Sequence, residues 1–277
     1  MGLKISVITI NYNRSAELET TIQSVVSQAS RDFEYIIIDG HSTDGSVETI
    51  KSCESNIDFW ISEQDNGIYD AMNKGIAKAQ GEYLVFLNSG DRFANAEVLG
   101  ILHKATQDQP SIDVFYGDML VERPGVAGQS YYSHPNKLSL FFFQEDTVNH
   151  QAAMVKASLF REFGRYPEQY QLAADFWLFL RAFVAEKQFY HIPKALVVYD
   201  FAGVSAQDGF KKYKEEQRHI WKDIVLAPAH QDKYLSEVAD LLEKKRHLVD
   251  VTNYKLVRLA LRIDKALKRL AGIFRRQ

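Results

Sequence analysis

Cysteine is nearly absent from this chain, since Cys53 is the only one among 277 residues. A single cysteine excludes an intramolecular disulfide and a zinc site built from several cysteines, so a reducing compartment such as the cytoplasm is expected. The apolar runs are far shorter than the roughly 20 residues that cross a bilayer, and no transmembrane helix is predicted. Met1–Ile10 lacks a basic stretch followed by a long apolar one, so no signal peptide is expected.

Motifs of several enzyme classes are also missing. The segment Thr9–Ser15, which follows the first predicted strand, contains no glycine, so the Gly-x-Gly-x-x-Gly fingerprint of dinucleotide-binding folds is absent. The chain has no Gly-Lys-Ser/Thr phosphate loop, no Gly-x-Ser-x-Gly elbow, no His-Glu-x-x-His pair and no Cys-x-x-Cys. Serine hydrolase, zinc protease and thiol-redox functions are therefore unsupported.

Glycine and proline are scarce, with 15 and 6 residues, and 46% of the chain is hydrophobic. These proportions exclude a disordered or fibrous chain and indicate a globular one. The length allows one large domain with an appendage, or two small domains.

The net charge of −3 hides an uneven distribution. Residues 254–277 contain eight lysines and arginines against one acid, Asp264, so the rest of the chain is acidic. An acidic body is repelled by nucleic-acid phosphates, and nucleic acid is therefore not expected as a partner. The basic tail favours contact with a membrane surface instead.

Short apolar runs alternate with amphipathic segments of helix length in the first half of the chain. The runs are rich in Val, Ile, Leu and aromatic residues, as expected of strands that are buried on both faces. This alternation predicts an α/β fold with right-handed crossovers and a mainly parallel central sheet. The predicted strands are Leu3–Ile10, Phe33–Ile38, Ile57–Ser62 and Tyr83–Leu87, and the predicted helices are Ala16–Gln28, Ser46–Ser52 and Tyr69–Ala79.

Polar residues follow each of the four strands, at the edge where a sheet of this type binds ligands. One such segment alone is equally well a turn, because Asn, Asp and Gly favour turns, but four consecutive strand ends favour a site. Carboxylates without a glycine-rich phosphate loop indicate that phosphate is held through a divalent metal, Mg²⁺ or Mn²⁺. The segments are Thr9–Asn13, Asp39–Gly45, Ser62–Gly67 and Asn88–Asp91.

These segments, in this order and at this spacing, resemble the motifs of the family 2 glycosyltransferases. The motifs are VITINYN at Val7–Asn13, IDGHSTDG at Ile38–Gly45, SEQDNGIYDAMNKG at Ser62–Gly75 and FLNSGD at Phe86–Asp91. Asn149–Gln151 and Leu172–Arg181 resemble the acceptor-side segment, so the similarity extends over about residues 3–200. The resemblance implies the GT-A fold, a nucleotide-sugar donor, a divalent metal and inversion at the anomeric carbon.

The resemblance also implies roles for residues of the donor half. Asp39 would accept a hydrogen bond from a uracil N–H or an equivalent base edge, and Asp65 would close on the base or the ribose. Lys74 would offset diphosphate charge, although a helix lysine is otherwise solvated. The residues expected to bind the nucleotide and donor are Thr9, Asn11, Asn13, Asp39, Asp65, Lys74, Asn88 and Ser89.

Two acidic residues are expected to carry the chemistry. Asp91 is the metal ligand that the resemblance implies, and it ends Asn88–Asp91, where the family usually has Asp-x-Asp or Asp-x-Asp-Asp. Asp175 matches the family's general base, and Ala174 stands where another acid usually precedes it. The base would take the proton of the acceptor hydroxyl, and the metal would stabilise the departing diphosphate. As an alternative, Asp175 is an acid that merely favours a helix dipole.

Three further residues are candidates for contacts with the acceptor or the diphosphate. The resemblance places His150 and Gln151 in the acceptor-side segment, whereas a histidine in an apolar stretch is otherwise a hydrogen-bonded structural group. Asp118 ends another predicted strand at the same edge of the sheet and is equally well a turn acid.

The chain is expected to divide into a catalytic domain, residues 1–205, and a helical extension, residues 206–277. Residues 1–118 would form the donor half of the catalytic domain and residues 119–205 the acceptor half.

Two helices are predicted in the extension, at Lys211–Val225 and Tyr234–Val251, and they would pack against the catalytic domain or form a homodimer contact. In residues 254–277 apolar residues recur every three or four positions with cations between them. This pattern predicts a basic amphipathic helix that lies on an anionic membrane, with packing on the body or in a coiled coil as the alternative.

Together these features predict an inverting, metal-dependent glycosyltransferase of cell-surface polysaccharide synthesis, such as O-antigen, capsule or exopolysaccharide. The donor would be a UDP-sugar, with GDP and dTDP as alternatives, and the acceptor a hydroxyl of a saccharide or a lipid-linked saccharide. The enzyme would be cytoplasmic and peripheral on the inner face of the cell membrane. The alternatives are a sugar-phosphate nucleotidyltransferase, whose usual glycine-rich loop is missing, and a catalytically silent scaffold that binds nucleotide sugars.

Overall fold

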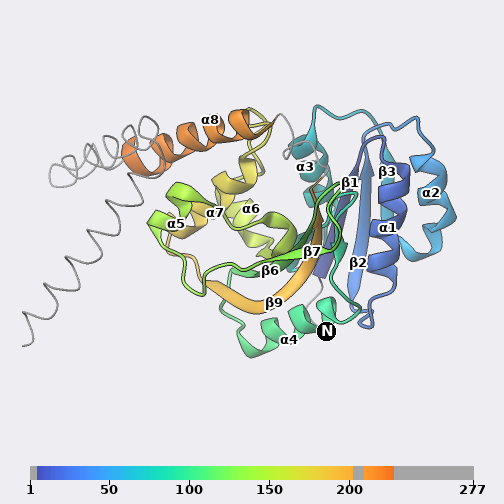
Figure 1. The fold of residues 1–277 in the computed structure, drawn as a ribbon, viewed down its shortest axis with the longest axis horizontal. Helices are drawn as coiled ribbons and strands as arrows, with labels where there is room; N and C mark the ends of the chain where they lie inside the picture. Colours follow the sequence, from blue (N-terminus) through green and yellow to red (C-terminus); the bar gives the residue numbers. More distant parts are fainter. Residues whose placement is uncertain (1–4, 202–208, 228–277) are drawn as a thin grey trace, which may run out of the picture. The chain divides into compact units, whose positions relative to one another are not determined.

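Residues 5–201 and 209–227 are described by the computed structural model, which is drawn in Figure 1. The chain divides into two units, Met1–Trp221 and Lys222–Gln277, and the short π-helix Lys222–Leu226 belongs to the second. The predicted helices at Tyr234–Val251 and 254–277 lie outside the described residues. The functional division at residues 205 and 206 stays a prediction.

The first four strands form the parallel part of the sheet, in the order β3-β2-β1-β4. Their registers align the polar strand ends, because Asn11 of β1 lies opposite Asp39 of β2, which in turn lies opposite Ser62 of β3. The strands and helices predicted here are confirmed, with described ends that differ by at most two residues. They are β1 (Ile5–Asn11), α1 (Ser15–Val26), β2 (Phe33–Asp39), α2 (Ser46–Ser52), β3 (Phe59–Ser62), α3 (Ile68–Lys78) and β4 (Tyr83–Phe86).

Alternate residues of β1 pack against helices on opposite faces of the sheet. Ile5 and Val7 share a buried cluster with Leu18 of α1, whereas Ile8 points to α3. A Cβ atom at Gly75 of α3 would lie 2.5 Å from Cγ2 of Ile8, so this helix can lie so close to the sheet only because position 75 has no side chain.

The second half of the sheet is mixed, and the order continues β4-β8-β6-β9-β5, with β7 paired to β6. Strand β8 is antiparallel to both β4 and β6, whereas β6 and β9 are parallel. The parallel arrangement predicted from the sequence thus describes strands β1 to β4. The strands are β5 (Arg92–Phe93), β6 (Val114–Glu122), β7 (Gln129–Tyr132), β8 (Ala153–Lys156) and β9 (Phe189–Asp200).

The remaining helices belong to the second half, apart from the 3₁₀ turn η1, which lies between α2 and β3. Helix α7 is almost entirely buried because its sequence ADFWLFLRAFV is apolar on all sides. None of the helices within residues 5–201 and 209–227 has the length and apolar character that a membrane crossing requires. The helices are α4 (Val98–Asp108), α5 (Leu140–Glu145), the 3₁₀ turns η1 (Glu54–Asn56) and η2 (His150–Ala152), α6 (Ser158–Phe163), α7 (Ala174–Val184) and α8 (Gly209–Trp221).

Candidate active site

Asp39 is the most heavily hydrogen-bonded carboxylate at the polar edge of the parallel strands. Its Oδ1 atom accepts hydrogen bonds from Asn11 Nδ2 at 2.7 Å and Ser42 Oγ at 2.6 Å. Its Oδ2 atom accepts from Ser42 N–H at 2.9 Å and Ser62 Oγ at 2.6 Å. Four donors satisfy this buried charge, and they fix the ends of the first three strands relative to one another.

Thr9 and Asn13, which were predicted to bind the nucleotide-sugar donor, instead hold parts of this edge of the sheet through hydrogen bonds within the chain. The hydroxyl of Thr9 lies in the core, where it donates to Leu87 C=O at 2.8 Å and contacts Tyr35 Oη at 3.1 Å. Asn13 has a positive φ of 49°, and its Oδ1 atom accepts from Thr43 N–H at 2.8 Å. Thr9 therefore supports the strand, and Asn13 shapes the loop that leaves it.

Next to Asp39, the side chains of Tyr12 and Asp65 lie close together over Gly40. The ring of Tyr12 is 64% exposed, and a Cβ atom at Gly40 would lie 3.2 Å from this ring and 2.4 Å from Asp65 Oδ2. Burial raises the pKa of Asp65, against the opposing effect of its hydrogen bond from Gly67 N–H. Asp65 was predicted from the sequence whereas Tyr12 was not, although Tyr12 lies inside the first motif and is exposed after the buried strand β1.

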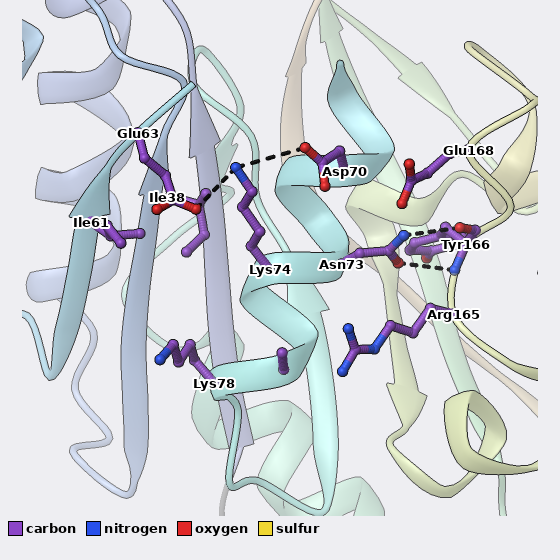
Figure 2. A pocket seen from close by; sticks show the side chains of 11 residues that line it. Ile38, Ile61, Glu63, Asp70, Asn73, Lys74, Lys78, Arg165, Tyr166 and Glu168 are labelled. Carbon is purple, nitrogen blue, oxygen red and sulfur yellow. Dashed lines mark hydrogen bonds and ion pairs between the residues drawn. The ribbon is translucent and has the colours of Figure 1, made fainter. Parts of the chain in front are cut away.

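Lys74 lies on α3 at a cavity of about 460 Å³, shown in Figure 2. Its Nζ atom contacts Glu63 Oε1 at 3.0 Å and Asp70 Oδ2 at 3.6 Å, and it donates to Gln64 C=O at 2.7 Å. Burial opposes the charge, yet the two carboxylates outweigh it and raise the pKa of Lys74. The structure therefore pairs Lys74 with acids of its own neighbourhood and not with Asn88 or Asp91.

The loop after β4 carries the predicted metal ligand, Asp91, which is 4% exposed. Its Oδ1 atom accepts a hydrogen bond from Asp200 N–H at 3.0 Å, at the end of β9. Burial raises the pKa of Asp91 to about 7, against the lowering effects of this hydrogen bond and of the His150 ring. Thr21 of α1 holds the loop in place, since its Oγ1 atom donates to Asp91 C=O at 2.8 Å and accepts from Gly90 N–H at 3.0 Å.

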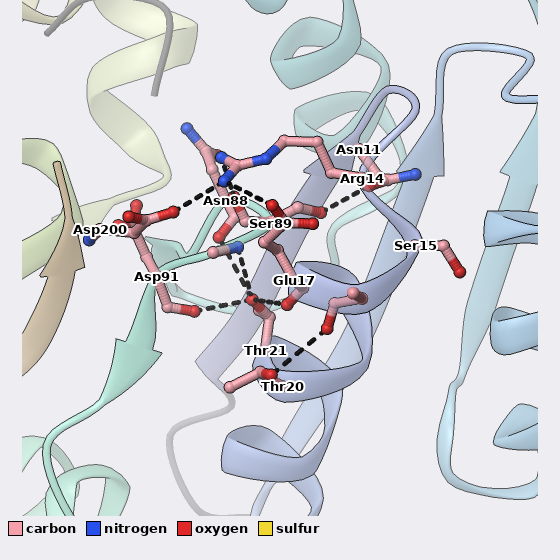
Figure 3. A network of polar contacts seen from close by, with 12 residues as sticks. Asn11, Arg14, Ser15, Glu17, Thr20, Thr21, Asn88, Ser89, Asp91 and Asp200 are labelled. Atoms are coloured by element: carbon pink, nitrogen blue, oxygen red, sulfur yellow. Dashed lines mark hydrogen bonds and ion pairs between the residues drawn. The ribbon is translucent and has the colours of Figure 1, made fainter. Parts of the chain in front are cut away.

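Arg14 connects this loop to the end of β9, as Figure 3 shows. The guanidinium of Arg14 contacts Asp200 Oδ2 at 2.7 Å and Glu17 Oε1 at 3.1 Å, and it donates to Ser89 C=O at 3.1 Å. The hydroxyl of Ser89 donates to Asn11 Oδ1 at 2.8 Å, which joins the loop to the Asp39 network. The predicted residues Asn11 and Ser89 are thus brought together, and Arg14 and Asp200 join them.

The side-chain oxygen atoms at this loop are of the kind that a hard divalent cation binds. Asn88 Oδ1 is buried without a hydrogen-bond partner, and the carboxylates of Asp91 and Asp200 lie at the same loop. Among the described residues, no group of three or more His, Cys, Asp and Glu side chains is arranged to hold a metal. Such a set fits an ion that takes one or two carboxylates and completes its shell with water and substrate phosphate, as Mg²⁺ does.

Asp175, the predicted base, is the second residue of α7 and is 7% exposed. Its Oδ1 atom accepts from Tyr69 Oη at 3.0 Å, and its Oδ2 atom lies 3.0 Å from His150 Nδ1. His150 Nε2 in turn lies 3.3 Å from Asn88 Nδ2. The structure therefore connects the predicted base to the predicted metal loop through one histidine, and Gln151 follows that histidine in η2, half-buried.

Asp118 belongs to a separate cluster. Its carboxylate accepts from Tyr131 Oη at 2.6 Å and from His134 N–H at 2.9 Å, and it pairs with His191 Nε2 at 2.8 Å. Burial opposes the charge, yet these partners outweigh it and lower the pKa of Asp118. Its contacts hold β6, β7 and β9 together, and the structure does not join it to His150 or Asp175.

Tyr69, Arg14 and Asp200 were missed as site residues. Tyr69 lies within the third motif, and its position in the first turn of α3, directly after the polar segment that follows β3, is a usable signal. Arg14 and Asp200 carry no such signal, because they are 186 residues apart in the chain and meet only in the folded structure.

Comparisons with known proteins agree with this geometry. A family model described as Glycosyl transferase family 2 matches residues 6–164. An uncharacterized glycosyltransferase of Mycobacterium tuberculosis is 38% identical over 182 residues, which are 64% of this chain and 68% of the relative. A PGL/p-HBAD biosynthesis glycosyltransferase of Mycobacterium bovis is 28% identical over 181 residues, which are 64% of this chain and 69% of the relative.

Two solved structures share the fold at low sequence identity. S. aureus TarS 1–349 in complex with UDP-GlcNAc has a TM-score of 0.68 and 18% identity, over 90% of this chain and 74% of that one. The mannosyltransferase PcManGT from Pyrobaculum calidifontis, in complex with GDP-Man and Mn²⁺, has a TM-score of 0.57 and 16% identity, over 96% and 81%. The chain is a glycosyltransferase with the α/β fold of the GT-A type, and it belongs to glycosyl transferase family 2.

Proposed function

We propose that this enzyme transfers a sugar from a UDP-sugar to a hydroxyl of a saccharide or lipid-linked saccharide, with inversion, during synthesis of a cell-surface polysaccharide. The observation that carries the proposal is the connection from Asp175 through His150 to Asn88, because the proposed base then lies next to the loop that would hold the donor diphosphate. The PGL/p-HBAD biosynthesis glycosyltransferase among the relatives and the UDP-GlcNAc complex of a structural neighbour support the substrate class.

The nucleoside would bind against Tyr12 and Asp65, beside Asp39. An exposed tyrosine ring offers a flat apolar surface for a base, and here Tyr12 stands next to Gly40 and the carboxylate of Asp65. Asp39 already accepts four hydrogen bonds, which occupy the lone-pair sites of a carboxylate, so we assign it to holding the strand ends, and a contact to the base would have to displace one of these four groups.

Asp91 would hold a divalent metal, Mn²⁺ or Mg²⁺, with Asp200 and the Asn88 amide oxygen as further oxygen donors. Mn²⁺ in the complex of the mannosyltransferase neighbour supports this assignment. The bound ion supplies positive charge that stabilises the departing diphosphate. The chain's part is to keep Asp91 buried and oriented by Asp200 N–H, and to keep the Asn88 oxygen unoccupied by its own groups.

Asp175 would take the proton of the acceptor hydroxyl as it attacks the anomeric carbon. Tyr69 Oη and His150 Nδ1 hold one oxygen of the carboxylate each, so the group cannot rotate. A neutral His150 that donates from Nδ1 must accept at Nε2, and the Asn88 amide group supplies that donor. With this tautomer of His150, the NH₂ group of Asn88 faces the ring and the amide oxygen faces away from it. The amide oxygen is therefore available to a ligand.

Calorimetric titration of UDP, GDP and dTDP, with and without Mn²⁺, tests the proposal. We expect UDP to bind in a metal-dependent manner, and Asp91→Asn to abolish that binding. Asp118→Asn serves as the control, because Asp118 is equally buried but belongs to the separate cluster. If no nucleotide binds in the presence of metal, the proposal is wrong.

We also keep the membrane proposal for residues 254–277, which lie outside the described residues. Their eight cations and apolar periodicity support binding to an anionic surface, which would bring the enzyme to a lipid-linked acceptor on the inner face of the cell membrane. Sedimentation with vesicles of anionic and of neutral lipid tests this. A homodimer formed by the C-terminal helices is the competing proposal, and measurement of the molar mass in solution distinguishes the two.

A further inference from the structure

Helix α8 places a buried carboxylate against the segment that leads into α7. Glu216 Oε1 accepts a hydrogen bond from Gln171 N–H at 3.0 Å, and its Oε2 atom accepts from Leu172 N–H at 2.9 Å and Ala173 N–H at 3.0 Å. Glu216 is 9% exposed, so these bonds form away from water. The side chain of Glu216 thus accepts hydrogen bonds from three consecutive backbone N–H groups, and these bonds fix the position of the segment before α7.

The held segment ends directly before the proposed base. Ala173 is the N-cap of α7 and provides no side-chain cap, and Asp175 is the second residue of the helix. A shift of residues 171–173 therefore carries Asp175 with it. Tyr69 and His150 fix the carboxylate of Asp175, and Glu216 fixes the backbone from which that carboxylate extends.

Other side chains of α8 reach the same region. Lys212 Nζ donates to Gln171 Oε1. Burial raises the pKa of Tyr213 well above its ordinary value, and the charge of Asp175 adds to the rise, so Tyr213 lies within electrostatic reach of the base. Helix α8 follows residue 164, where the match to the family model ends, so this chain supports its base with an element outside that match.

We propose that Glu216 is a positioning residue that sets the location of Asp175 relative to the donor, an inference that rests on the proposed function. Its carboxylate touches neither the donor loop nor the Asp175 side chain, and it acts through the backbone of residues 171–173. Misplacement of a catalytic group by about 1 Å costs up to about 100-fold in rate. Loss of Glu216 should therefore slow turnover without weakening the binding of the nucleotide.

The experiment compares Glu216→Ala and Glu216→Gln with Glu215→Gln, an exposed neighbour on the same helix. UDP-glucose, UDP-galactose and UDP-N-acetylglucosamine are offered with Mn²⁺, and the one from which the wild-type chain releases UDP fastest is used. We expect kcat to fall by about 10- to 100-fold in Glu216→Ala and by less in Glu216→Gln, which keeps one acceptor oxygen. The donor KM, the calorimetric Kd for UDP and the control variant should stay within about twofold of the wild type.

Hydrogen exchange of the amides of residues 171–173 provides a readout that does not depend on activity. These amides should exchange faster in both Glu216 variants and at the wild-type rate in Glu215→Gln.

Faster exchange with unchanged kcat would overturn the inference. A loss of UDP affinity in parallel with the loss of kcat would also overturn it, because it indicates general loss of structure. If Glu216→Ala does not fold, Glu216→Gln decides by the same criteria. A wild-type rate in Asp175→Asn would instead overturn the proposed function, with the exchange result still reporting on Glu216.

Discussion

Replacement of Asp91 by asparagine should stabilise the chain at alkaline pH while it abolishes metal binding. Asp91 is 4% exposed, and burial raises its pKa from 3.8 to about 7. Between these two values the folded chain holds a proton that the unfolded chain has released, so the free energy of unfolding falls as the pH rises from about 4 to about 7. Above that range the full cost of the buried charge is present. Asparagine has nearly the same shape and carries no charge.

The magnitude follows from the difference between the two pKa values. At 1.36 kcal/mol for each pH unit, a rise from 3.8 to about 7 corresponds to about 4 kcal/mol. We therefore expect Asp91→Asn to raise the free energy of unfolding by up to about 4 kcal/mol at pH 8 and by clearly less at pH 5.

Urea unfolding at pH 5 and pH 8, with EDTA present, measures this difference. Asp39→Asn is the matched control, because Asp39 is buried at the same edge of the sheet but accepts four hydrogen bonds, and an amide NH₂ would face donors there. The control should lose about 1–3 kcal/mol at both pH values. The reasoning is refuted if Asp91→Asn destabilises the chain at pH 8 or has the same effect at both pH values.

Three further outcomes can be measured. Asp175→Asn should lower kcat by about 100- to 10,000-fold with an unchanged calorimetric Kd for UDP, and a smaller loss would argue against its role as base. Gly75→Ala should lower the free energy of unfolding by about 1–3 kcal/mol in urea, because its Cβ would lie 2.5 Å from Ile8 Cγ2, and a neutral effect would show that α3 shifts easily. Asp118→Asn should lower the melting temperature, because it disrupts a buried pair with His191, while UDP affinity stays at the wild-type value.

The donor half could be predicted from the sequence because its signals are local. Each apolar run is followed at once by its polar residues, and a parallel register is sufficient to bring Asn11, Asp39 and Ser62 side by side. The resemblance to the family added Asp91 and Asp175, and in the structure Asp175 is hydrogen-bonded to His150, whose ring also influences the pKa of Asp91.

The remaining contacts could not be predicted, because they depend on chain segments that are far apart. Asp118 was predicted to end a strand as Asp39 does, but it lies inside β6, and only the pairing of β6 with β7 and β9 brings Tyr131 and His191 to its carboxylate. Glu216 looks like any helix glutamate in a lysine-rich segment, and its burial against residues 171–173 depends on how α8 packs. The sequence carries no local pattern for contacts of this kind.

The tight fit around Gly90 restricts how this loop can change during evolution. Gly90 has a φ of +102°, and a Cβ atom there would lie 2.7 Å from Asp200 Oδ2 and 3.1 Å from Arg14 Nη1. An aspartate at position 90 would restore the second acid of the usual family motif, but it would collide with the carboxylate of Asp200 and repel it. Positions 14, 90 and 200 are therefore coupled, because an aspartate at position 90 requires the side chains of Asp200 and Arg14 to move and also strains the backbone at a positive φ.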